Sequence, residues 1–66
     1  MTYSEIKKYL FDDCVVRNEE FEYKTMINLL MCREIGTAKW RYVLNIGEYE
    51  KKMEWELVGK AWLINF

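Results

Sequence analysis

The sequence predicts an α+β domain in which one N-terminal helix packs on an antiparallel β-meander of three to four strands. Three observations support this class: a helix-capping signal near the start of the chain, Gly-X pairs between alternating segments in the C-terminal half, and opposite charges that face each other in the register set by those pairs. The alternative is two helices on a three-stranded meander. With 66 residues, we expect a single small domain spanning residues 1–66.

The first predicted element is an amphipathic helix over residues 3–13. Thr2 and Glu5 have the spacing of a capping box, in which each side chain accepts a hydrogen bond from the other residue's amide. Apolar side chains then recur at helical spacing up to an acidic pair, at Ile6, Tyr9 and Leu10.

Residues 19–34 admit two interpretations. As a strand, the odd positions from Phe21 onward form one largely apolar face, and a short loop leads into the next strand. As a helix, Asn18 is the N-cap and Gly36 is the C-terminal stop. The strand is favoured, because Phe21 would lie on the polar side of the helix.

The C-terminal half is predicted to form the meander. Gly47-Glu48 and Gly59-Lys60 each separate segments rich in aromatic and branched residues, which is the pattern of a two-residue type II′ hairpin. Both glycines are therefore expected at positive φ. The strands are then residues 37–46, 49–58 and 61–66.

The register set by these turns places Trp40 opposite Trp55, near the middle of the sheet. On the other face it predicts two pairs of opposite charge: Lys39 with Glu56 and Arg41 with Glu54. Trp55 is accordingly expected to be buried, and the glutamates of this segment to form a solvated, charge-paired surface.

Composition argues against catalysis. The chain has no His, and its formal net charge is −1, so the commonest general base is missing and no overall field favours a phosphate backbone. We assign no catalytic residue, cofactor or metal ligand, and we expect Cys14 and Cys32 to be small buried hydrophobic residues. The absence of a signal-peptide pattern, and of any apolar run long enough to span a membrane, predicts a reduced, cytoplasmic protein.

The helix is too small to cover the predicted sheet. A helix of about eleven residues is roughly 16 Å long, whereas four strands spaced about 4.8 Å apart present a wider face. Large uncovered apolar surfaces usually bind a partner. The predicted partner-binding residues are the aromatic and branched side chains of that face: Trp40, Tyr42, Trp62, Ile64 and Phe66.

We therefore expect a small protein-interaction module that acts by occupying a surface of another protein. The richness in Lys, Asn, Ile and Tyr without Pro or His is typical of small proteins encoded by phages and mobile elements, some of which inhibit a host or defence factor. A nucleic-acid-binding regulator using the aromatic sheet face is the alternative function. The unprotected strand edge at residues 61–66 predicts a homodimer.

Overall fold

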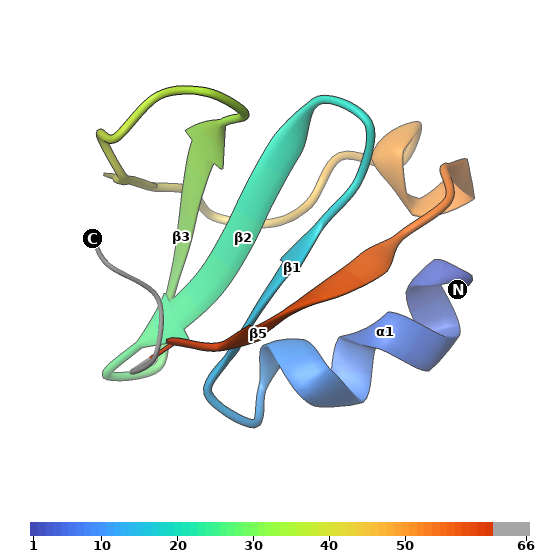
Figure 1. The fold of residues 1–66 in the computed structure, drawn as a ribbon, viewed down its shortest axis with the longest axis horizontal. Helices are drawn as coiled ribbons and strands as arrows, with labels where there is room; N and C mark the ends of the chain where they lie inside the picture. The colour runs from blue at the N-terminus through green and yellow to red at the C-terminus, as the bar shows by residue number, and fades with distance from the viewer. Residues whose placement is uncertain (62–66) are drawn as a thin grey trace.

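The computed structural model describes residues 1–61 and confirms the α+β class, with one helix packed on a five-stranded antiparallel sheet (Figure 1). The strand order is β4-β3-β2-β1-β5, so the first four strands form a meander and β5 returns beside β1. The elements are α1 (Tyr3–Leu10), β1 (Cys14–Arg17), β2 (Phe21–Met26), β3 (Leu29–Glu34), β4 (Arg41–Tyr42), the 3₁₀ helix η1 (Glu50–Lys52) and β5 (Glu56–Lys60).

Helix α1 begins as predicted and ends earlier. The Glu5 amide donates to Thr2 Oγ1 over 3.3 Å and the Thr2 amide donates to Glu5 Oε1 over 2.8 Å, which completes the capping box. The Thr2 amide also holds the pKa of Glu5 below its usual value. The helix ends at Leu10 with Phe11 as its C-cap, and Asp13 then takes a left-handed conformation (φ 55°) directly before β1.

Residues 19–34 form neither one strand nor a helix, so both predictions for this segment are wrong in extent. They fold into a β2–β3 hairpin whose two-residue turn is Ile27 (φ 51°) and Asn28 (φ 64°). Positive φ at both central residues defines a type I′ turn, which matches the twist of the flanking strands. Because of this two-residue turn, the odd-numbered residues of β2 pair with even-numbered residues of β3. Tyr23 therefore pairs with Cys32, and both side chains face the core.

The predicted hairpin at Gly47-Glu48 is wrong. The Gly47 carbonyl accepts hydrogen bonds from the amides of Glu50 and Lys51, so the chain coils into η1 instead of reversing between strands. Gly47 is not at positive φ among the described residues. The expected opposition of Trp40 and Trp55 is therefore absent, as are the pairs Lys39–Glu56 and Arg41–Glu54.

Gly59 has positive φ, as predicted, but it lies inside β5 and not in a turn. It pairs with Val15 while Leu57 pairs with Val16, so Val58 is an extra residue in the ladder. This is a β-bulge, and the φ of 153° at Gly59 is a backbone conformation that side chains disfavour. The strand predicted at 61–66 lies, apart from Ala61, outside the described residues.

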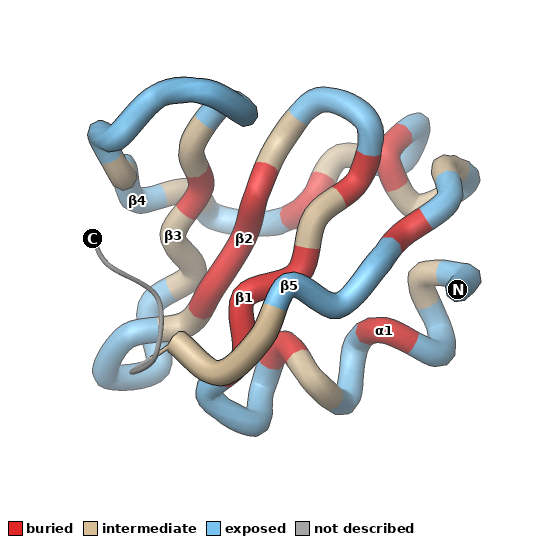
Figure 2. The backbone as a smooth tube through the Cα atoms, viewed as in Figure 1, coloured by how far each residue is buried: buried red, intermediate tan, exposed pale blue. Residues whose placement is uncertain are grey.

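The core lies between α1, the segment that follows β4, and the inner face of the sheet (Figure 2). Its buried side chains are Ile6, Leu10, Val16, Tyr23, Cys32, Ile46 and Trp55. Trp55 is 2% exposed, which confirms its predicted burial although it precedes β5 and is not part of a strand. Both cysteines are buried free thiols, as expected of small hydrophobic residues. Within residues 1–61, no helix is long and apolar enough to cross a membrane.

A buried carboxylate joins the two layers. Glu50 was predicted to be exposed, yet it is 5% exposed and accepts hydrogen bonds from the Tyr23 hydroxyl over 2.6 Å and from Asn18 Nδ2 over 3.0 Å. Asn18 Oδ1 in turn accepts the amides of Glu20 and Phe21, which shapes the β1–β2 turn. Burial, together with the bond to Glu50, raises the pKa of the Tyr23 hydroxyl far above its ordinary value.

The type I′ turn generates a stability prediction. Ile27 is β-branched and 90% exposed, so it holds an unfavourable backbone conformation without burying its side chain. Replacing it with Asn, which tolerates positive φ, should stabilise the fold by about 1 kcal/mol and raise the melting temperature by about 4–8 °C. Ile35→Asn is the matched control, because Ile35 is also exposed and is not at positive φ. Equal effects of the two substitutions on thermal unfolding would contradict the turn assignment.

The Tyr23–Glu50 bond predicts the response to alkali. Folding raises the pKa of Tyr23. The contribution of Tyr23 to the free energy of unfolding is therefore fully present below its pKa in the unfolded chain, 10.0, and is lost as the pH rises above that value. Tyr23→Phe should cost about 1–3 kcal/mol at neutral pH, and its unfolding free energy should fall less steeply than the parent's between about pH 9 and 11. Tyr42→Phe, at an exposed position, should retain the parent's slope. Urea titrations at each pH measure this, and identical slopes for Tyr23→Phe and parent would refute the linkage.

Candidate functional site

The helix side of the sheet is incompletely covered. Helix α1 and the segment after β4 both pack on this side, and in Figure 1 that segment (yellow to orange) passes behind the sheet. Between the end of α1, the β2–β3 turn and residues 42–46 there remains a hollow of about 280 Å³, here called the apolar groove. Its lining includes Leu10, Phe11, Leu29, Leu30, Tyr42 and Leu44.

Several large apolar side chains surround this groove in exposed positions. Leu44 is 82% exposed, Phe11 64%, Tyr42 54% and Leu29 49%. Ile27 is 90% exposed and directly precedes Asn28, which also lines the groove. Phe11 and Leu44 are exposed apolar residues that line the groove, and together they are called the apolar patch. Leu29 pairs with Met26 and Tyr42 pairs with Met31, in register with the core-facing pair Tyr23–Cys32, so the side chains of Leu29 and Tyr42 lie on the opposite face of the sheet.

The groove carries little charge. Among residues 1–61, Lys51 is its one charged lining residue, and the Lys51 ammonium donates to Glu48 Oε2 over 2.8 Å. That hydrogen bond raises the pKa of Lys51. The ammonium also lies 5.6 Å from the ring centroid of Tyr3, another lining residue. The groove therefore offers apolar contact area and no uncompensated cation for an anionic ligand.

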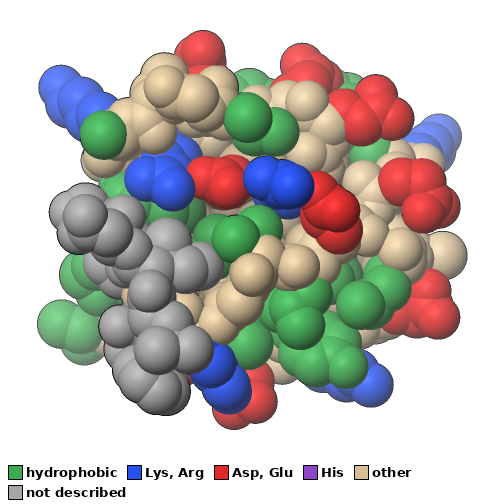
Figure 3. Space-filling model, in the orientation of Figure 1, with side chains coloured by type: hydrophobic (Ala, Val, Ile, Leu, Met, Phe, Trp, Pro, Cys, Tyr) green, Lys and Arg blue, Asp and Glu red, His purple; other side chains and the backbone are tan. Residues whose placement is uncertain are grey.

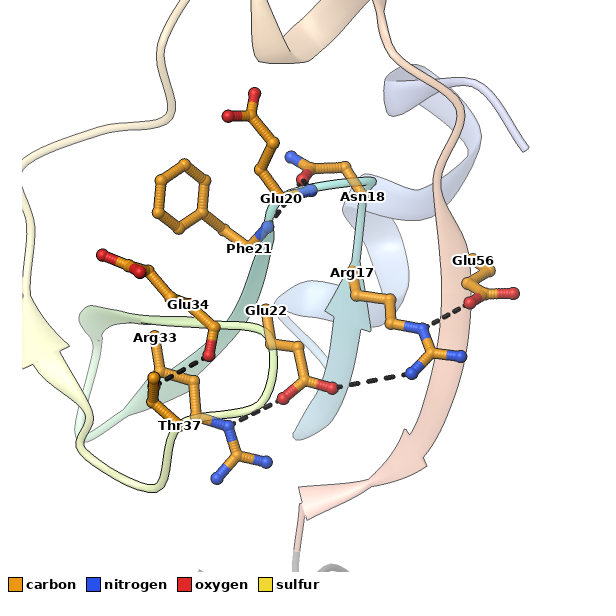
Figure 4. Close-up of polar contacts among 9 residues, drawn as sticks. All are labelled: Arg17, Asn18, Glu20, Phe21, Glu22, Arg33, Glu34, Thr37 and Glu56. Carbon is orange, nitrogen blue, oxygen red and sulfur yellow. Dashed lines mark hydrogen bonds and ion pairs between the residues drawn. The ribbon is translucent and has the colours of Figure 1, made fainter.

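The opposite face of the sheet is built from ion pairs. Arg33 Nε donates to Glu22 Oε1 over 2.7 Å, and Arg17 lies 3.9 Å from the other Glu22 oxygen and also donates to Glu56. The four side chains form a row of alternating sign across β5, β1, β2 and β3 (Figures 3 and 4). Glu22 is only 7% exposed. A buried charge needs compensation, and the guanidinium groups of Arg17 and Arg33 supply it.

Trp40 belongs to this charged face and not to the groove. Lys24 Nζ lies 4.4 Å from its ring centroid, and the Arg33 guanidinium lies 4.5 Å away. Burial lowers the pKa of Lys24. A separate hollow is lined by Arg33, Lys39 and Arg41 together with Glu34 and Thr37. The π-system of Trp40 is thus already engaged by two cations of the protein itself.

Of the predicted partner-binding residues, the structure describes Trp40 and Tyr42, and of these two only Tyr42 lines the groove. Tyr42 lines it, whereas Trp40 lies over the opposite face of the sheet. Trp62, Ile64 and Phe66 lie outside the described residues.

The apolar patch was missed by the sequence analysis. Phe11 was placed inside the helix, and Leu44 was placed within a long strand. One signal was present in the sequence: the consecutive apolar residues 29–32 break the alternation that a single strand requires. That break, next to Asn28, indicates a turn at this point.

The buried polar groups Asn18, Tyr23 and Glu50 are hydrogen-bonded to one another inside the fold. Among residues 1–61, no three thiol or carboxylate groups lie close enough together to hold a metal ion. The Glu50 oxygen that accepts from Asn18 and Tyr23 lies inside the fold, and burial raises the pKa of the Cys32 thiol. These interactions stabilise the packing of the two layers.

Comparison with known proteins supplies no assignment: no protein-family model matches the chain, and neither a curated protein nor a solved structure shows significant similarity to it.

The ion-pair row predicts a contrast between buried and exposed carboxylates. Glu22→Gln leaves Arg33, whose side chain is 14% exposed, without its carboxylate partner. This substitution should lower the free energy of unfolding by about 1–3 kcal/mol. Glu48→Gln removes a pair in which the glutamate is 87% exposed, and it should change stability by less than about 0.5 kcal/mol. Chemical denaturation of both variants makes the comparison, and equal losses would show that the row contributes no more than a surface pair.

Proposed function

We propose that this protein is a small non-catalytic interaction module whose apolar groove binds another polypeptide. The observation that carries the proposal is the apolar patch. Phe11 is 64% exposed and Leu44 is 82% exposed, and both line the groove. Apolar side chains that gather in water around a groove, and are not scattered singly, usually mark an interaction site.

The chemistry of the groove favours a polypeptide over nucleic acid. Binding to a phosphate backbone depends on several Lys or Arg side chains that release counterions. Lys51, the one charged residue of the groove lining, is already paired with Glu48. On the opposite face, Arg17 and Arg33 are engaged by carboxylates. Two further cations, Lys39 and Arg41, line a separate hollow, and a nucleic-acid-binding role would act through them.

The proposed biological role is occupation of a partner's surface in the cytoplasm. The small size supports it, because a chain of 66 residues can cover a binding site but has little room for a separate catalytic apparatus. The two free buried thiols are compatible with a reducing compartment. Inhibition of a host or defence factor by a protein of a phage or mobile element is one role of this kind, and the composition supports that origin.

A site-specific photo-crosslinker tests the proposal in the native host. Placed at Leu44, which is 82% exposed, it should form adducts with protein. Placed at Glu54, whose side chain is equally exposed at 82% and does not line the groove, it should form few. Adding Phe11→Asp to the Leu44 variant should remove the adducts, because the charge enters the same groove.

Three results would oppose the proposal: equal labelling from both positions, labelling from Leu44 that survives Phe11→Asp, or adducts with nucleic acid alone. The last of these would favour the regulator and direct attention to Lys39 and Arg41.

A further inference from the structure

We draw no further inference here: the strongest candidate, the apolar groove between the end of α1, the β2–β3 turn and residues 42–46, carries none because nothing in the structure shows what covers it.

Discussion

The arrangement of the two layers depends on the carboxylate of Glu50, buried at the start of a 3₁₀ turn. It receives the Tyr23 hydroxyl from the middle of the sheet and the Asn18 amide from the β1–β2 turn. The Glu50 carbonyl also accepts the Trp55 indole N–H over 2.9 Å. One residue therefore connects β2, the β1–β2 turn and the largest core side chain. A buried carboxylate is expensive to leave without hydrogen bonds, so this segment has few alternative positions.

The same constraint explains the glycine that precedes the turn. A Cβ atom at Gly47 would lie 3.2 Å from Glu50 Oε2 and 3.3 Å from the Tyr49 ring. The glycine permits close approach of the backbone to the carboxylate, and it is not needed there for positive φ. Anchored at Glu50, the preceding chain lies along the helix side of the sheet and contributes Ile46 to the core. The short helix α1 cannot reach the far end of this layer, and the apolar groove is the space that remains.

The two faces of the sheet are stabilised by different interactions. On one face, charged groups compensate each other across four strands, and Glu22 is shielded between Arg17 and Arg33. On the other face, apolar side chains pack beneath α1 but leave the apolar patch in water. Since the ion pairs on the first face satisfy one another, the proposed interaction acts through the groove on the second face. This asymmetry is the physical basis of the proposed interaction role.

Local sequence determined those features that depend on neighbouring residues. The capping box of Thr2 and Glu5 works within one helical turn, and the apolar spacing of Ile6 and Leu10 places both in the core. The α+β class followed from such local patterns, as did the burial of Trp55. Tertiary structure decided the pairing of the strands. Gly47 lies in the same local pattern as a hairpin glycine. Glu50, however, accepts hydrogen bonds from Tyr23 and Asn18, which are distant in the sequence, and the chain after Gly47 forms the 3₁₀ helix η1 instead of a hairpin.

The groove could not be predicted from the sequence, for the same reason. Its walls come from α1, the β2–β3 turn and residues 42–46, which lie apart in the chain and meet only after the strands pair. A one-residue change of parity at a turn moves every later side chain to the other face, so missing the turn at Ile27 and Asn28 misassigned β3. Sequence alone thus determined the kinds of local structure and the apolar content available for binding. The long-range hydrogen bonds and strand pairing decided which apolar residues were buried and which remained exposed.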